Sequence, residues 1–154
     1  MDERQRRVWL GSGLVVLQFG LLAMLALLAW PAVKHWTIPL AAWPTAIGAV
    51  LLAVWALGSN RLGNFNIRPI PKTGGVLVTQ GPYHWIRHPM YTAFLLGAWA
   101  LARTAARDEA WLAWYVLTLV LWLKSRYEER WMLAQHPGYA AYRQQTKRFL
   151  PWLF

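Results

Sequence analysis

Four apolar stretches, separated by polar connections, dominate the pattern of the chain. The first two, residues 8–30 and 39–58, are each long enough for a helix to cross a hydrocarbon core, which takes about 20 residues. Two shorter ones, residues 91–106 and 110–123, follow a long polar connection at residues 59–90. This pattern predicts an all-α integral membrane protein with about four transmembrane helices, of which the last two form a short C-terminal helical hairpin.

The fourth apolar stretch is the shortest. Its 14 residues would cover roughly 21 Å as a helix, less than a full crossing unless the helix continues past Lys124. We therefore expect a pair of short helices lining a cavity. Residues 124–154 become amphipathic and charged. There we expect cytoplasmic helices to about Gln135 and from Tyr139 to Phe149, broken by His136-Pro137-Gly138.

The composition also favours a membrane protein. Hydrophobic residues make up 57% of the 154 and charged residues only 14%, against roughly a quarter in soluble domains. The net charge is +10, and the basic residues lie between the apolar runs instead of along one face of an amphipathic helix. This distribution favours anionic lipid headgroups over nucleic acid as partners. The lack of cysteine excludes disulfides and thiolate metal sites, and the four scattered histidines suggest no metal. Without repeats or linkers, residues 1–154 are expected to form one domain.

The distribution of basic residues predicts the orientation in the membrane. With four crossings, 13 of the 16 Lys and Arg residues fall on the side that holds both termini and the connection at residues 59–90. Cytoplasmic loops carry such an excess of positive charge. We therefore expect both termini and the long connection to be cytoplasmic.

The first stretch with candidate chemistry is Gly-Pro-Tyr-His-Trp-Ile-Arg-His-Pro-Met-Tyr at residues 81–91. Proline suits the first turn of a helix, so Pro89 is expected to begin one, with Arg87 and His88 at its N-terminus. Unpaired N–H groups and the positive end of the helix dipole there favour an anionic group such as a carboxylate. The alternative is that this stretch only anchors a membrane helix at the headgroups.

The second stretch follows the fourth apolar run and contains Arg126, Glu128, Glu129 and Arg130. Charges near hydrocarbon are costly unless they are paired or used. Two acids between arginines can neutralise themselves locally, so an interfacial salt-bridge cluster is the plain alternative to a functional site.

These stretches together resemble a known family. The matching motifs are Leu77-Val78-Thr79-Gln80-Gly81-Pro82-Tyr83, Arg87-His88-Pro89-Met90-Tyr91, Glu128-Glu129, and Tyr139-x-x-Tyr142 with Arg148-x-x-Pro151. Their order resembles that of the integral-membrane methyltransferases of the isoprenylcysteine carboxyl methyltransferase family, to which phospholipid N-methyltransferases are related. The resemblance covers about half of the chain.

The resemblance implies a cytoplasm-facing site for S-adenosylmethionine. Backbone groups around Val78 to Gly81 would meet the adenine, and Glu129 the ammonium or the ribose hydroxyls. His88 and the amides near Pro89 would meet the polar tail. The cofactor-binding residues expected from it are Val78, Gly81, Tyr83, Arg87, His88, Pro89, Tyr91 and Glu129.

Two residues are expected to act on the methyl acceptor. Transfer requires a nucleophile about 3 Å from the methyl group and the exclusion of water. A carboxylate acceptor would be oriented by Arg126, whereas an amine acceptor would need Glu128 as a base. A lipophilic acceptor would enter sideways from the bilayer, through the opening between the helices of the hairpin.

The sequence departs from the family at Ala93, where relatives have glycine, and only two apolar spans precede the motifs. A small lipid or a hydrophobic carboxylate, amine or thiol needs less recognition surface than a prenylated protein, so we expect an acceptor of this smaller kind. We expect isoprenylcysteine-like carboxylate O-methylation, with N-methylation of phosphatidylethanolamine as the alternative. A noncatalytic module that binds anionic lipid or a partner protein is the alternative from another class.

Overall fold

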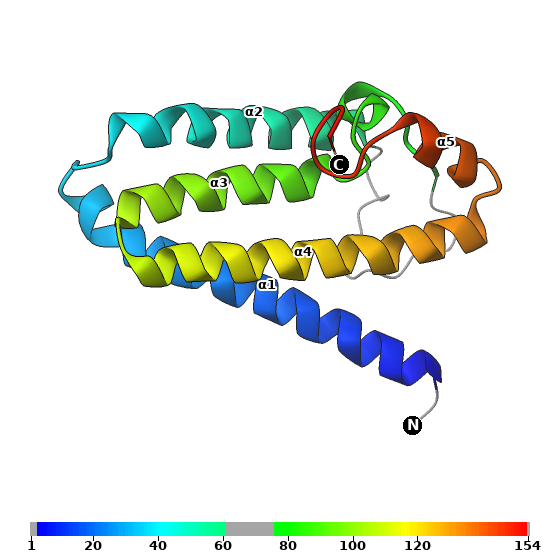
Figure 1. Ribbon diagram of the computed structural model, residues 1–154, viewed down its shortest axis with the longest axis horizontal. Helices are drawn as coiled ribbons and strands as arrows, with labels where there is room; N and C mark the ends of the chain where they lie inside the picture. The colour runs from blue at the N-terminus through cyan, green and yellow to red at the C-terminus, as the bar shows by residue number, and fades with distance from the viewer. Residues whose placement is uncertain (1–2, 61–75, 154) are drawn as a thin grey trace.

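The computed structural model describes residues 3–60 and 76–153, and Figure 1 shows their arrangement. The helices are α1 (Glu3–Lys34), η1 (Leu40–Ala42), α2 (Trp43–Ser59), η2 (Gly81–His84), α3 (Pro89–Ala105), α4 (Asp108–Gln135) and α5 (Tyr139–Gln145). The described part holds no β-strand, only an isolated bridge between Ile86 and Lys147. The prediction of an all-α fold is confirmed. The middle of the predicted cytoplasmic connection, residues 61–75, lies outside the described residues.

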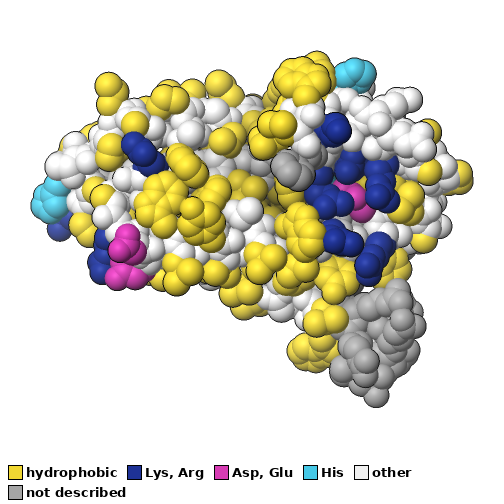
Figure 2. All heavy atoms as spheres, in the orientation of Figure 1, with side chains coloured by type: hydrophobic (Ala, Val, Ile, Leu, Met, Phe, Trp, Pro, Cys, Tyr) yellow, Lys and Arg dark blue, Asp and Glu magenta, His cyan; other side chains and the backbone are white. Residues whose placement is uncertain are grey.

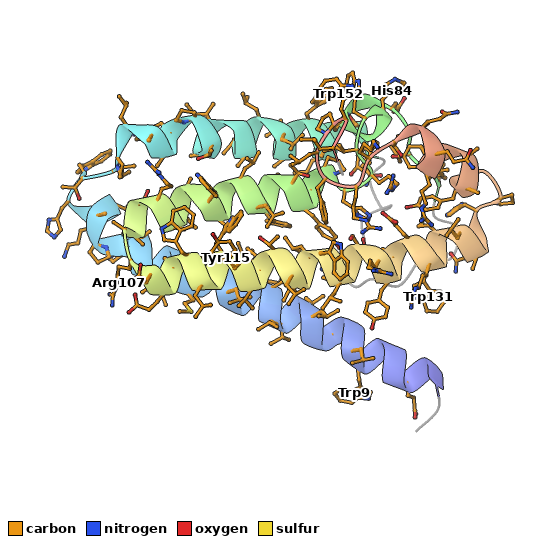
Figure 3. All side chains as sticks on the ribbon, in the orientation of Figure 1. Trp9, His84, Arg107, Tyr115, Trp131 and Trp152 are labelled. Atoms are coloured by element: carbon orange, nitrogen blue, oxygen red, sulfur yellow. The ribbon has the colours of Figure 1, made fainter. Side chains whose placement is uncertain are left out.

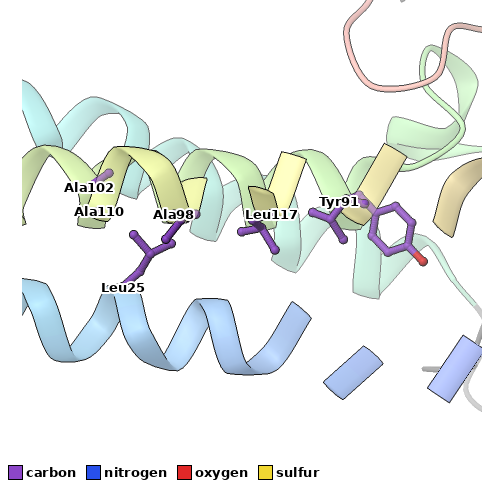
Figure 4. Packing of buried hydrophobic residues seen from close by; sticks show 8 residues of the cluster. Leu25, Tyr91, Ala98, Ala102, Ala110 and Leu117 are labelled. Carbon is purple, nitrogen blue, oxygen red and sulfur yellow. The ribbon is translucent and has the colours of Figure 1, made fainter. Parts of the chain in front are cut away.

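The long helices form a bundle in which α3 packs against α1, α2 and α4, and α1 also packs against α4. Figure 4 shows the core where these helices meet, with Leu25 from α1, Ala98 from α3, and Ala110 and Leu117 from α4. Small residues such as alanine let helix backbones approach closely, which is how helices associate where lipid removes the hydrophobic driving force. The many alanines of α3 and α4 therefore fit packing inside a membrane.

Two helices are long and apolar enough to cross a membrane, at Trp9–Lys34 and Leu40–Ser59. Their surfaces carry large apolar side chains, such as Leu27 at 73% exposure and Leu51 at 65%. Figure 2 shows hydrophobic side chains over the body of the molecule and Lys and Arg side chains gathered at the end where α5 lies. That two of the predicted helices can span a bilayer is confirmed, whereas crossings by α3 and α4 remain predictions.

Helix α4 continues past Lys124, the possibility that the sequence left open for the fourth apolar stretch. Helix α4 is continuous over 28 residues, about 42 Å at 1.5 Å per residue. It contains neither proline nor glycine, and Lys124 is accommodated by burial against α1. Helix α3, with 17 residues, is close to the predicted stretch, whereas α4 is longer than the short helix expected there. The apolar stretch and the charged Glu128-Glu129 pair lie on one helix.

The last helix is shorter than predicted. Helix α5 begins at Tyr139 as expected but ends at Gln145, and Thr146 is extended. The reason is that the backbone of Lys147 pairs with the segment before α3 instead of continuing the helix. Helix α3 begins at Pro89, as predicted, and Pro44 lies in the first turn of α2.

Candidate active site

Two segments far apart in the sequence run side by side at one end of the bundle. The Arg87 N–H donates to the Lys147 carbonyl at 2.8 Å, and the Lys147 N–H donates to the Trp85 carbonyl at 3.0 Å. The His88 N–H donates to the Arg148 carbonyl at 3.1 Å. These bonds fix the entrance to α3 against the segment that follows α5. Helix α4 contributes the third part of the site, because its Glu128 and Glu129 face this junction.

Glycine is required at Gly81, which turns the chain into η2. Its φ is +62°, a left-handed conformation that favours glycine, and a Cβ would lie 2.0 Å from Ser59 Oγ. The absence of a side chain therefore lets η2 lie on the end of α2. The Tyr142 hydroxyl then donates to the Tyr83 carbonyl at 2.6 Å, which connects η2 to α5.

Glu129 is the centre of the cluster, and its side chain is only 4% exposed. Its Oε1 accepts from Arg87 Nε at 3.0 Å, Arg148 Nε at 3.0 Å and His88 Nε2 at 3.2 Å. Its Oε2 accepts from Arg148 Nη2 at 2.9 Å, so the Arg148 guanidinium binds both oxygens. Charge-assisted and bidentate bonds of this kind are among the strongest in proteins and fix geometry. One buried carboxylate thus joins α4, the entrance to α3 and the C-terminal segment.

The charges in this cluster support one another. Burial raises the pKa of Glu129, but bonds from His88, Arg148 and Arg87 outweigh it and hold that pKa well below its usual range. Burial lowers the pKa of His88, but its bonds to Glu128 and Glu129 outweigh burial and raise it. His88 Nδ1 also lies 3.5 Å from Glu128 Oε2, so both ring nitrogens face carboxylates and both act as donors in the imidazolium.

Glu128 lies beside this centre and is more open, with a side chain 22% exposed. It accepts a hydrogen bond from the Tyr91 hydroxyl. The His88 and Tyr91 rings stack almost in parallel, with centroids 5.3 Å apart and 4° between their planes. Tyr91 and His88 therefore hold the Glu128 carboxylate from two directions while part of it remains accessible.

Arg87 also ties the end of α5 to the cluster. Its Nη1 donates to the carbonyl oxygens of Arg143, at 3.2 Å, and of Thr146. Carbonyls at the end of a helix have no partner within the helix, and a guanidinium there satisfies them. Arg87 thereby binds Glu129 on one side and the C-terminal segment on the other.

The structure brings most of the predicted site residues together. Arg87, His88, Tyr91, Glu128 and Glu129 form the cluster, and Pro89 begins the helix behind it. The carbonyl of Tyr83 accepts the hydrogen bond from Tyr142 on α5, and Gly81 packs against Ser59 and Trp55 on α2. Val78 is half-buried in the chain before η2.

Arg126 does not join the cluster. Its side chain is exposed and lies over the Trp122 ring on α4, with the guanidinium carbon 4.9 Å from the ring centroid. The alternative, that arginines next to the two glutamates in the sequence neutralise them, does not hold for Glu129. Its partners, Arg87 and Arg148, come from other segments, because the buried face of α4 turns Glu129 inward while Arg126 and Arg130 remain exposed.

Sequence reasoning missed Arg148, Thr146 and Tyr142 as parts of the site. Arg148 and Tyr142 belong to motifs that carried the family resemblance, and that was the available signal. Nothing local marks Thr146, whose carbonyl and hydroxyl both face Arg87. Within the described ranges no group of His, Cys, Asp or Glu could hold a metal ion.

Comparison with known proteins gives two matches. A family model described as phospholipid methyltransferase matches residues 36–137, about two thirds of the chain. The cobalt-zinc-cadmium resistance protein CzcN of Cupriavidus metallidurans is 35% identical over 86 residues, which cover 53% of this chain and 38% of that protein. The match thus spans less than half of that relative's length. No solved structure matches the chain.

Proposed function

We propose, from the premise that the chain belongs to the phospholipid methyltransferase family, that it is a membrane-embedded enzyme that transfers a methyl group from S-adenosylmethionine to a lipophilic acceptor. The observation that supports this most is the cluster around Glu129. It joins the Arg-His-Pro segment, the Glu-Glu pair and the C-terminal segment, which are the motifs of the resemblance, at one end of the bundle. An ordinary headgroup anchor would not require these three segments to converge.

The residues of the cluster fit the polar tail of S-adenosylmethionine, which carries a carboxylate and an ammonium. Arg148 is partly open, with a side chain 21% exposed, and a guanidinium suits a carboxylate. Glu129 Oε1 is crowded by three donors, whereas Oε2 accepts from Arg148. A carboxylate oxygen accepts about two hydrogen bonds, so Oε2 has room for an ammonium. When bound, S-adenosylmethionine supplies an electrophilic methyl group on a sulfonium.

The acceptor side of the site is best assigned to Glu128. An amine must lose a proton before it attacks the methyl carbon, and Glu128 is a carboxylate with part of its surface accessible. Its oxygens take up that proton, while Tyr91 and His88 hold the carboxylate in place. The deprotonated nitrogen would then be free to take the methyl group of a bound S-adenosylmethionine, with S-adenosylhomocysteine as the leaving product.

We accordingly propose a phospholipid amine, such as the headgroup of phosphatidylethanolamine, as the acceptor. This replaces the carboxylate acceptor that the sequence led us to expect, because that acceptor relied on Arg126 as the orienting cation, and the Arg126 side chain lies over Trp122, outside the cluster. A lipid amine also suits a site at the end of apolar helices, because the acyl tails remain in hydrocarbon while the headgroup reaches the cluster.

The assay is transfer of labelled methyl from S-adenosylmethionine by protein in nanodiscs, with phosphatidylethanolamine or an isoprenylcysteine as acceptor. The proposal predicts labelled phosphatidylethanolamine from the wild type and strongly reduced transfer by Glu128→Gln. The Glu109→Gln variant is the matched control, because Glu109 lies at the far end of the same helix and is exposed. Labelling of the isoprenylcysteine alone would contradict the proposal of an amine acceptor and would support a carboxylate acceptor instead. Labelling of neither would contradict a lipid acceptor of these two kinds.

A further inference from the structure

A buried polar pair, Gln18 and Lys124, connects α1 to α4 about one helical turn before Glu128 and Glu129 on α4. The Lys124 ammonium donates to Gln18 Oε1 at 2.6 Å, and both residues are only 2% exposed. Gln18 lies within the candidate membrane span of α1, with Leu17 and Phe19 exposed on either side. The pair therefore joins α4 to the part of α1 that is long and apolar enough to span a membrane.

Such a pair is costly as a purely structural contact. Removing an ammonium from water costs several kcal/mol before any compensation, and apolar residues of similar size often stabilise as well or better. Ionisable side chains within membrane spans are therefore usually retained for function. The buried residues that α1 and α4 contribute to the hydrophobic core are leucine and alanine, so packing of α1 on α4 does not itself require a lysine.

The surroundings of Lys124 indicate what it acts on. Its ammonium lies over the face of the Tyr91 ring, 5.1 Å from the centroid. Glu128 is one helical turn further along the same face of α4, and the two charges attract each other. The Tyr91 hydroxyl in turn binds Glu128. Lys124 thus lies against one face of the Tyr91 ring and attracts the Glu128 carboxylate, to which the Tyr91 hydroxyl donates.

We propose that Gln18 and Lys124 are positioning residues for methyl transfer, which fix Tyr91 and Glu128 on the acceptor side without touching the methyl donor. This inference rests on the proposed function. Gln18 holds the Lys124 ammonium in place, and the ammonium orients the Tyr91 ring by cation–π attraction and draws the Glu128 carboxylate toward it. The first helix thereby contributes to catalysis, although none of its described side chains bonds to Glu129.

Three variants test the inference in nanodiscs that contain phosphatidylethanolamine. These are Lys124→Met, Lys124→Arg and the double variant Gln18→Leu with Lys124→Met. Thermal unfolding, binding of S-adenosylhomocysteine and release of S-adenosylhomocysteine from S-adenosylmethionine are measured for each. Lys34→Met is the control, because Lys34 is an exposed lysine at the end of α1.

The double variant separates positioning from stability. It replaces the buried polar pair with apolar side chains, so its unfolding temperature is expected to equal or exceed that of the wild type. Its affinity for S-adenosylhomocysteine is expected to stay within about twofold, while kcat falls by about tenfold or more, which corresponds to losing one well-placed group. Lys124→Arg keeps the charge and is expected to recover part of kcat.

Three results would overturn the inference. Wild-type turnover by a stable double variant would make the pair a structural contact only. A loss of S-adenosylhomocysteine affinity in parallel with kcat would place Lys124 on the donor side. A wild type that releases no S-adenosylhomocysteine would refute the proposed function itself, and the inference would fall with it. Turnover by the wild type distinguishes the third result from the first two, because both of those are read from variants of an active enzyme.

Discussion

Ile86 and Lys147 form a parallel backbone bridge, and the residue directly after each of them is an arginine that binds Glu129. Arg87 comes directly after Ile86, and Arg148 directly after Lys147. A short backbone pairing thus sets two guanidinium groups on the same carboxylate. The binding geometry of the cluster is therefore fixed by the main chain as well as by the attraction of charges.

Replacement of Arg148 by lysine is predicted to weaken both the fold at this end and binding of S-adenosylhomocysteine. Lysine carries the charge but lacks the planar fork that binds both oxygens of Glu129. We expect a loss of about 1–3 kcal/mol in unfolding free energy, the range for hydrogen bonds to charged groups. Thermal unfolding in detergent and calorimetric titration measure the two effects. Arg107→Lys, at the exposed far end of the bundle in Figure 3, should change neither.

Replacement of Gly81 by alanine is predicted to displace η2 from the end of α2. The left-handed φ and the 2.0 Å approach to Ser59 Oγ both oppose a side chain, so we expect a loss of about 1–3 kcal/mol. The unfolding temperature reports the effect. Gly138→Ala is the matched control, because nothing lies within 4 Å of a Cβ built there, and its change should stay within about 0.5 kcal/mol. Equal effects of the two variants would refute this explanation.

Replacement of Tyr142 by phenylalanine is predicted to loosen η2 from α5. The variant keeps the buried ring but removes the hydroxyl that donates to the Tyr83 carbonyl at 2.6 Å. The expected loss is about 1 kcal/mol, and hydrogen exchange of the η2 amides should rise. Tyr115→Phe serves as control, since Tyr115 is 62% exposed and lies toward the other end of the molecule in Figure 3. Unchanged exchange in Tyr142→Phe would show that the bond contributes little.

The pKa shifts of the cluster predict that its stability depends on pH from both sides. The folded pKa of Glu129 is lowered, so its contribution is present above about pH 4.3, the unfolded value, and is lost as pH falls through the folded pKa. The folded pKa of His88 is raised, so its contribution is full below about pH 6.5 and is lost as pH rises through the folded pKa. Both contributions are therefore greatest between about pH 4.3 and 6.5.

The variant His88→Gln tests the alkaline side of this window. It is predicted to remove the decline in unfolding temperature that His88 causes in the wild type as the pH rises above about 6.5. His35→Gln is the control, because His35 is an exposed histidine at the end of α1, and its profile should follow the wild type. A wild-type decline that persists unchanged in His88→Gln would contradict the assignment.

Part of this architecture could be predicted from the sequence, because local signals determine it. The long apolar runs predict the helices of the bundle. Pro89 predicts the start of α3, because its ring removes only an N–H that has no partner in the first turn of a helix. The Arg-His-Pro and Glu-Glu motifs gave most of the cluster. These signals lie within a few residues of the structure they determine.

Contacts between distant segments could not be predicted in the same way. The end of α5 at Gln145 depends on the pairing of Lys147 with Ile86, and nothing near Gln145 encodes that partner. The burial of Lys124 in α4 also involves Gln18, which lies 106 residues earlier in the chain. The outward direction of Arg126 likewise follows from which face of α4 the other helices cover.

Figure 3 places the ionised side chains between α4 and α5 at the end of the bundle that carries Trp131, and the central claim is that this cluster binds a methyl donor. Calorimetric titration of the detergent-purified protein with S-adenosylhomocysteine tests it most directly, with Glu129→Gln and the control Glu109→Gln in parallel. The account predicts binding by the wild type and by Glu109→Gln, and at least a tenfold loss, about 1.4 kcal/mol, in Glu129→Gln. Folded wild-type protein that binds no S-adenosylhomocysteine, or Glu129→Gln that binds as tightly as the wild type, would contradict it.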